Sequence, residues 1–217
     1  MQSQTFHIGG DGGISIAAEA TGNADALPVL LAHGGGQSRH AWKLVTADLA
    51  NAGFRPIAID MRGHGDSEWS AEGAYETRDF ASDLVAIASK MDRKPALVGA
   101  SLGGLAGLIA EGHLAPGRFA SLTLVDIAPR METGGVMRVV GFMEEHVETG
   151  FSSPDEAAEV KTHILAFAKT SRDFALQHHT DCPVGVGPAV RPYSRLPPTG
   201  EFLNEADMEV RGHIRSV

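Results

Sequence analysis

Residues 96–104, ALVGASLGG, carry the pattern that decides the fold of this 217-residue chain. A short apolar run leads into the pattern GxSxG, and an apolar helical pattern begins after it. Between a strand and a helix, GxSxG is typical of a strained turn that lifts a nucleophilic serine above a sheet. We therefore predict that Ser101 is a nucleophile and that side chains at Gly99 and Gly103 would clash with the adjacent strand and helix. The alternative is a buried serine at a glycine-rich helix start.

A second glycine-rich segment, VLLAHGGG at residues 29–36, again places a short apolar strand before a loop. Glycines let a backbone N–H come within hydrogen-bond distance of a developing negative oxygen without interference from side chains. The N–H of Gly35 is one expected donor. The N–H of Leu102 is the other, because the helix that begins after Ser101 directs its N-terminal end and its dipole at the reacting centre. We therefore predict an oxyanion hole formed by Gly35 and Leu102.

Short apolar runs alternate with helical patterns along the first 130 residues. The runs that we expect to be strands are residues 14–18, 29–32, 56–59, 96–98 and 122–125. Apolar residues spaced by three and four predict a helix over residues 77–91, with Thr77 as its N-cap. The glycines in residues 9–13 predict a turn between two antiparallel strands. This alternation predicts an α/β fold with a mostly parallel sheet that is covered on both faces.

Four motifs, in this order, resemble the α/β-hydrolase superfamily in its serine esterase and haloperoxidase-like branches. They are HGGGxS at 33–38, DMRGHGDS at 60–67, GASLGG at 99–104 and the strand LTLVDIAPR at 122–130. The resemblance implies an α/β-hydrolase fold with a helical cap over a pocket. It also implies that His33 supports the glycine loop by hydrogen bonds; the alternative for His33 is the catalytic base.

The motifs divide the chain into three expected segments. Residues 1–130 form the α/β-hydrolase core, residues 131–170 a helical cap-like segment, and residues 171–217 an irregular tail rich in Pro and Gly. Prolines interrupt any helix or central strand in that tail. Because no pattern there matches the last strands of the fold, we expect the C-terminal strands to be missing.

A serine becomes a good nucleophile only when a histidine accepts its proton and an acid orients that histidine. The GxSxG turn is called the nucleophile elbow, and the helix after it the elbow helix. Asp126 is the predicted acid, because it ends the strand that follows this helix and some family members carry the acid there. The alternative is an aspartate that anchors the loop by capping Ala128 or Pro129. The resemblance places the histidine after the last strand of a longer chain, and the candidate here is His213, in VRGHI near the C-terminus.

Composition and charge limit the partners and the compartment. With 43% hydrophobic and 21% charged residues, the chain is typical of a soluble globular protein, and no apolar run approaches the roughly 20 residues of a membrane helix. A net charge of -9 without a basic stripe argues against a nucleic-acid partner. The N-terminus shows no secretory signal, which predicts a cytoplasmic location. A single cysteine, Cys182, and the lack of HExxH or paired CxxC motifs predict no disulfide framework, no metal and no cofactor.

These observations predict a serine hydrolase that cleaves small carboxylic esters or related acyl substrates through an acyl-Ser101 intermediate. A serine rather than an aspartate at the elbow argues against dehalogenation and epoxide opening. Two alternatives stay open. One is perhydrolase or haloperoxidase-like activity with the same serine, and the other is a truncated, catalytically silent remnant of the fold. The sequence leaves the identity of the ester and the oligomeric state open.

Overall fold

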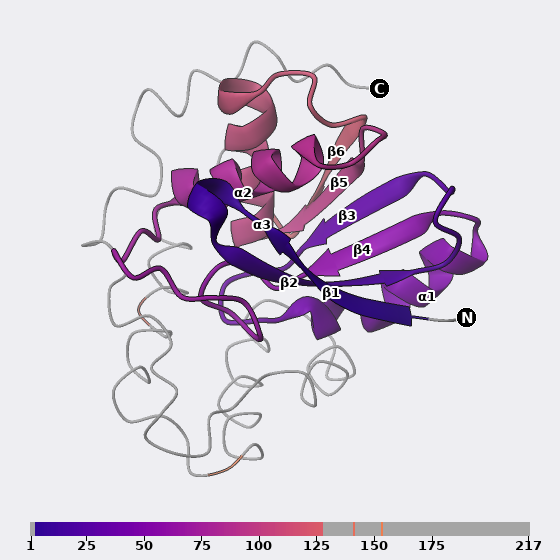
Figure 1. Cartoon of the computed structure of the whole chain (residues 1–217), viewed down its shortest axis with the longest axis horizontal. Helices are drawn as coiled ribbons and strands as arrows, with labels where there is room; N and C mark the ends of the chain where they lie inside the picture. Colours follow the sequence, from indigo (N-terminus) through magenta and orange to yellow (C-terminus); the bar gives the residue numbers. More distant parts are fainter. Residues whose placement is uncertain (1–2, 128–140, 142–152, 154–217) are drawn as a thin grey trace. The chain divides into compact units, whose positions relative to one another are not determined.

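A computed structural model describes residues 3–127, 141 and 153 of the chain, which Figure 1 draws in colour. Six strands in the described part form one sheet in the order β1-β2-β4-β3-β5-β6. The strand β2 is antiparallel to β1 and to β4, whereas the pairs β3–β4, β3–β5 and β5–β6 are parallel. The strands are β1 (Ser3–Gly9), β2 (Ser15–Thr21), β3 (Pro28–Ala32), β4 (Arg55–Ile59), β5 (Ala96–Ala100) and β6 (Ser121–Val125).

Helices connect the parallel strands and cover both faces of the sheet (Figure 1). The helix α1 (Lys43–Asn51) links β3 to β4, α2 (Thr77–Ser89) links β4 to β5, and α3 (Leu102–Ile109) links β5 to β6. The short helices are the 3₁₀ helices η1 (Asp11–Gly13) and η2 (Arg39–Trp42) and the π-helix η3 (Ala110–Leu114). The predicted α/β-hydrolase architecture, with a mostly parallel and doubly covered sheet, is confirmed.

The core lies on both sides of β3, whose five residues are all buried. Leu30 joins the apolar cluster that contains the buried residues of α2 and α3. Leu31 joins the cluster on the other face, which contains Trp42. Successive side chains of a strand point to opposite faces, so a strand buried on both faces is apolar at every position. The continuous apolar run that ends at Ala32 therefore places β3 in the middle of the sheet.

The turn predicted for residues 9–13 is confirmed, because η1 joins the antiparallel strands β1 and β2. Gly12 and Gly13 there have positive φ angles of 65° and 85°, a conformation in which glycine carries little strain.

The predicted N-cap of α2 was wrong by one residue. Glu76, not Thr77, is the N-cap, and Thr77 is the first helical residue. The side chains of Glu76 and Asp79 each accept a hydrogen bond from the other's backbone N–H. This reciprocal pair satisfies two N–H groups that the first turn of a helix leaves unpaired. In the described residues, the Thr77 side chain makes no such hydrogen bond.

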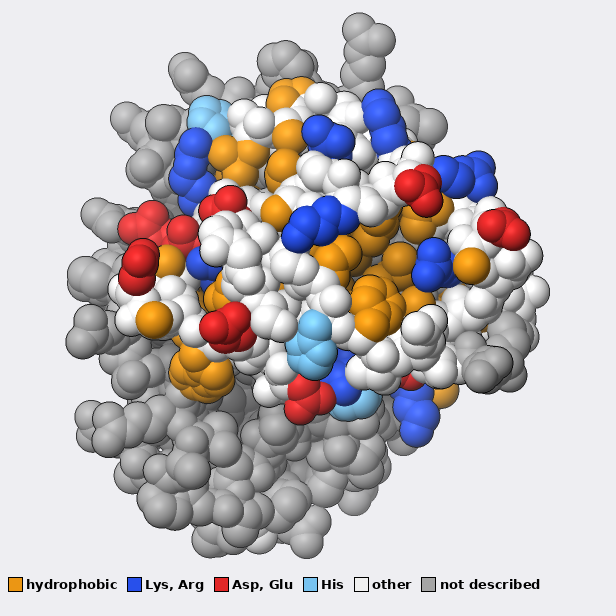
Figure 2. All heavy atoms as spheres, in the orientation of Figure 1, with side chains coloured by type: hydrophobic (Ala, Val, Ile, Leu, Met, Phe, Trp, Pro, Cys, Tyr) orange, Lys and Arg blue, Asp and Glu red, His pale blue; other side chains and the backbone are white. Residues whose placement is uncertain are grey.

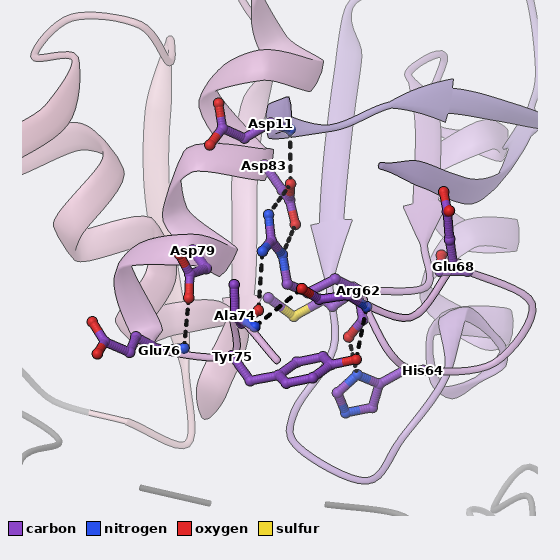
Figure 3. A network of polar contacts seen from close by, with 12 residues as sticks. Asp11, Arg62, His64, Glu68, Ala74, Tyr75, Glu76, Asp79 and Asp83 are labelled. Carbon is purple, nitrogen blue, oxygen red and sulfur yellow. Dashed lines mark hydrogen bonds and ion pairs between the residues drawn. The ribbon is translucent and has the colours of Figure 1, made fainter. Parts of the chain in front are cut away.

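A buried ion pair joins the loop after β4 to α2. The Arg62 guanidinium donates to both carboxylate oxygens of Asp83, through Nε at 2.6 Å and through Nη2 at 2.7 Å. Arg62 also donates to the Ala74 carbonyl, and the backbone N–H of Asp11 donates to Asp83 at 2.8 Å. Figure 3 shows Arg62 and Asp83 pointing toward each other from different elements. This pair therefore ties three segments that are distant in sequence.

Charged side chains of both signs are spread over the face of the described part that Figure 2 shows. On the face in Figure 2, Lys and Arg side chains are scattered among Asp and Glu rather than gathered in one stripe. In the same part of the chain, no helix has the length and apolar character needed to cross a membrane.

The cap predicted for residues 131–170 and the tail predicted for residues 171–217 lie outside the described residues, apart from Gly141 and Ser153. The expectation about missing C-terminal strands also falls there. The three-segment division of the chain therefore stays a prediction.

The substitution Asp83→Ala is expected to lower the free energy of unfolding by about 3–5 kcal/mol, because it leaves the buried Arg62 guanidinium without its counter-charge. Urea unfolding followed by circular dichroism measures the change. The control is Asp92→Ala, which removes an exposed aspartate and should change stability by less than about 0.5 kcal/mol. Equal unfolding midpoints for the two variants would contradict a stabilising role for the pair.

Candidate active site

Ser101 stands at a strained turn between β5 and α3. Its backbone angles are φ 45° and ψ -110°, a region that residues other than glycine rarely adopt. The Ser101 N–H donates to the Val125 carbonyl of the neighbouring strand at 3.1 Å, and the serine residue is exposed. The predicted strand, sharp turn and helix are therefore all present, and strain of this kind is typical of functional sites.

The two glycines of GxSxG make this turn possible. A Cβ atom on Gly99 would overlap the backbone of Gly103 and Gly104, and a Cβ on Gly103 would overlap the backbone of Ala32 in β3. The clashes predicted from the sequence are thus confirmed, because the helix start lies directly against β3 and β5.

Leu102 is the first residue of α3, so its N–H has no partner within the helix. The next N–H, that of Gly103, donates to the His33 carbonyl at 3.1 Å, and that of Leu105 donates to the Ser101 carbonyl at 2.9 Å. Within the described part of the chain, the Leu102 N–H makes no hydrogen bond. It is therefore available to an oxygen at Ser101.

Hydrogen bonds hold most of the backbone N–H groups in the loop from Gly34 to Gln37. The Gly34 N–H donates to the Gln37 side-chain oxygen at 3.0 Å, and the Gly36 N–H donates to His64 Nε2 at 3.2 Å. The Gly34 carbonyl accepts from the Gln37 N–H at 3.2 Å and from His33 Nδ1 at 2.7 Å. Among the described residues, the Gly35 N–H alone in this glycine run has no acceptor.

The hydrogen bond of His33 also sets the direction of the Gly35 N–H. The Gly34 carbonyl and the Gly35 N–H belong to one planar trans peptide, so they point in opposite directions. His33 holds the carbonyl on its own side, which turns the N–H away from His33. The glycine loop lies close to Ser101, because the position of a Cβ on Gly34 is 3.4 Å from Ser101 Cβ.

His33 is fully buried and both of its ring nitrogens are engaged. The Met61 N–H donates to Nε2 at 3.0 Å, so the ring proton must lie on Nδ1, which donates to the Gly34 carbonyl. Burial, together with the neighbouring His64, lowers the pKa of His33 from 6.5 to about 3. This geometry matches the supporting role expected for His33 and leaves no nitrogen free to act as the catalytic base.

Asp126 and Ser101 occupy matching positions, each directly after the C-terminal end of its strand. The parallel register pairs Ala100 of β5 with Val125 of β6, and each candidate residue follows its strand directly. Asp126 is exposed and has a φ of 53°. The structure thus brings the predicted acid Asp126 beside Ser101, and the roles of both residues stay predictions. The alternative capping partners, Ala128 and Pro129, lie outside the described residues, as does His213.

The loop after β4 holds residues to which sequence analysis assigned no role. Asp60 is fully buried and accepts from the Arg39 backbone N–H at 2.6 Å, from the Arg39 guanidinium and from the Asp66 N–H at 2.9 Å. Arg39 also pairs with Asp66 at 2.8 Å. His64, whose pKa is lowered by burial, accepts a hydrogen bond from the Gly36 N–H through Nε2. The run of polar residues in DMRGHGDS was the available signal for this support.

No group of three or more His, Cys, Asp or Glu side chains that could hold a metal is present in residues 3–127, 141 and 153. Cys182 lies outside the described residues.

Comparisons to known proteins agree with the observed fold. A family model for the alpha/beta hydrolase fold matches residues 28–217. The chain belongs to this family. A crystal structure of an α/β hydrolase from Novosphingobium aromaticivorans DSM 12444 is similar, with a TM-score of 0.69 and 22% sequence identity over 82% of this chain and 63% of that one. At this identity, the likeness shows the fold.

Two curated relatives match part of the α/β-hydrolase chain. An esterase of Mycobacterium tuberculosis is 35% identical over 102 residues, which are 46% of this chain and 33% of the esterase. A non-heme chloroperoxidase of Streptomyces lividans is 33% identical over 120 residues, which are 54% of this chain and 42% of that protein. The match therefore spans only about a third to two fifths of the length of these relatives.

Because of His33, the free energy of unfolding of the protein should decrease as the pH is lowered. Its pKa in the folded state is about 3 against 6.5 for a free side chain, so below pH 6.5 the unfolded chain binds a proton that the folded chain does not. The contribution is complete above pH 6.5 and is lost as the pH falls toward 3. Between pH 8 and pH 5, it lowers the free energy of unfolding by about 2 kcal/mol.

Urea unfolding at pH 8 and pH 5 measures this loss as a difference between proteins. His33→Asn should lose about 2 kcal/mol less than the wild type over this interval, although it is less stable at pH 8. His7→Asn, on exposed β1, is the control and should keep the wild-type pH dependence. An identical dependence in His33→Asn and the wild type would mean that His33 is not held neutral.

Proposed function

We propose that this protein is a serine hydrolase that cleaves small carboxylic esters or related acyl substrates through an acyl-Ser101 intermediate. One observation carries the proposal. Ser101 is held in a strained, exposed position at a helix start, and the N–H groups of Leu102 and Gly35 beside it make no hydrogen bond in the described part of the chain. An exposed hydroxyl with two unpaired N–H donors nearby is the arrangement that stabilises a tetrahedral oxyanion.

The chemistry proceeds in two steps. A histidine accepts the proton of Ser101 while Oγ attacks the carbonyl carbon, and the carbonyl oxygen becomes an oxyanion that Gly35 and Leu102 bind. The alkoxide leaves with the proton from the histidine, and the acyl group stays on Ser101. In the second step, water attacks the acyl-Ser101 carbonyl carbon and gives its proton to the histidine. The carboxylic acid product then leaves, and Ser101 Oγ takes the proton back from the histidine. The chain order of serine, acid and histidine in this family supports Asp126 in the orienting role and a histidine that follows it in the chain, for which His213 is the candidate.

The name of the esterase relative supports ester cleavage. Because the match spans only about a third of that relative, activity of this chain rests on the site rather than on the relative. A small uncharged substrate fits the net charge of -9 better than an anionic one does.

Perhydrolysis is a second candidate, favoured by the relatives named non-heme chloroperoxidase. Hydrogen peroxide would take the place of water in the second step and attack the acyl-Ser101 carbonyl, so that the product is a peracid. The first step and the residues that perform it are the same. The silent remnant predicted as an alternative would instead form no acyl-enzyme at all.

A fluorophosphonate probe should label Ser101 in the purified chain, because a nucleophile activated by a base attacks the phosphorus and displaces fluoride. Intact mass should show a single adduct on the wild type and none on Ser101→Ala. Ser121→Ala removes an exposed serine of β6 and should label as the wild type does. A folded wild-type chain that takes no label would favour the silent remnant.

The substitution Asp126→Asn is expected to lower kcat by about 10³-fold or more, because an amide cannot hold the catalytic histidine in the required tautomer. Asparagine tolerates the positive φ found here, so the backbone should persist. Hydrolysis of p-nitrophenyl butyrate measures the effect, with Asp92→Asn at an exposed site as control. A kcat within about threefold of the wild type would assign Asp126 to loop anchoring and place the acid elsewhere.

A further inference from the structure

Gln37 stands beside the nucleophile without any role in the reaction described above. The position that a Cβ on Gly34 would occupy is 3.1 Å from Gln37 Oε1 and 3.4 Å from Ser101 Cβ. The amide of Gln37 and the side chain of Ser101 are therefore both in contact range of the same point above Gly34. The side chain of Gln37 is half-buried.

The orientation of the Gln37 amide is set by chemistry. The backbone N–H of Gly34 donates to it at 3.0 Å. An N–H can donate only to the oxygen of an amide, so Oε1 must face Gly34 and Nε2 must face away from it. The backbone N–H of Gln37 donates to the Gly34 carbonyl, which closes a small ring of hydrogen bonds and fixes the side chain close to its own backbone.

The second half of this amide is unused. Nε2 carries two N–H groups, and it makes no hydrogen bond in the part of the chain that the structure describes. Fastening the glycine loop requires only an acceptor at this position. A carboxylate would serve that purpose, so the donor of Gln37 is not explained by the loop.

We propose that Gln37 Nε2 is a substrate-binding donor of the active site and that the protein prefers esters with an acceptor oxygen on the acyl chain close to the scissile carbonyl. This inference rests on the proposed function. The acyl group becomes bonded to Ser101 in the first step and leaves it in the second, so it lies next to Ser101 in both, and a donor on the Gln37 amide can act on it in both. An ether, keto or amide oxygen on the acyl chain accepts such a bond, whereas a plain alkyl chain does not.

The test compares esters that differ by one atom. In p-nitrophenyl methoxyacetate, an oxygen replaces one methylene of p-nitrophenyl butyrate; p-nitrophenyl 3-methoxypropionate and pentanoate form the second pair. The quantity measured is the ratio of kcat/KM for ether over alkyl ester in each pair. Intrinsic reactivity differs within a pair, but it cancels when a variant is compared with the wild type.

Two substitutions separate the donor from the acceptor. Gln37→Glu keeps an acceptor for Gly34 and removes the donor, and Gln37→Met removes both without adding charge. In at least one pair, both variants should lower the ether-to-alkyl ratio about fivefold, which is the expected loss for one neutral hydrogen bond. Gln4→Glu makes the same change on exposed β1 and should leave both ratios at their wild-type values.

A role in fastening the loop alone gives a different result. The Met variant would then lose activity on all four esters alike, and the Glu variant would keep the wild-type ratios. Unchanged ratios in the Glu variant overturn the proposal, as does a fall seen with Glu but not with Met, which would report repulsion between the carboxylate and the ether oxygen. Circular dichroism and labelling of Ser101 by a fluorophosphonate verify that each variant is folded.

Failure of the proposed function is recognised separately, as a wild-type chain that hydrolyses none of the four esters and takes no label. The Gln37 donor is then tested by an NMR titration that measures the binding of ethyl methoxyacetate and of ethyl butyrate to the Ser101→Ala chain. A preference for the ether that Gln37→Glu abolishes supports the donor. Equal binding of the two esters overturns it.

Discussion

The left-handed backbone of Ser101 is the constraint on which the rest of the described structure depends. The turn is held at its C-terminal side because Gly103 lies against Ala32 of β3, and at its N-terminal side because Gly99 lies against the first turn of α3. The Ser101 N–H is held by Val125 of β6. Contacts with three neighbouring strands therefore hold one strained residue in place, and the same contacts bring the glycine loop and Asp126 close to Ser101.

Polar residues hold the glycine loop where the elbow needs it. His33 and His64 each accept one backbone N–H through Nε2, from Met61 and Gly36 respectively. Asp60 holds the end of the loop through the backbone and side chain of Arg39. Because the side chains of His33, His64, Asp60 and Arg39 are buried, an unpaired member would cost far more than a surface hydrogen bond contributes. The loop is therefore fixed before a substrate arrives, which is the condition for electrostatic stabilisation of a transition state.

The fold was predictable wherever burial produced a pattern. The apolar runs of β3, β4 and β5 and the GxSxG turn indicated the sheet and the elbow, because a strand buried on both faces must be apolar throughout. The helix α1 was missed, since Leu44 and Val45 are exposed and Ala50 is its one buried residue, which leaves no amphipathic stripe to detect. Gln37 was missed for a different reason. The role proposed for Gln37 depends on the spatial approach of Gly34 to Ser101, and no sequence spacing encodes that approach.

The same hydrogen bonds bear on which histidine can be the base of the proposed reaction. His33 and His64 are the histidines of the glycine loop and its support, and in both the Nε2 atom is already occupied by a backbone N–H. Protonation of either ring would break that bond, because a protonated Nε2 cannot accept one. A base must cycle between its two protonation states without loosening the site. The two histidines therefore hold the glycine loop by staying neutral, which argues against either of them as the base of the proposed reaction. The order of serine, acid and histidine in this fold favours a histidine that follows Asp126 in the chain.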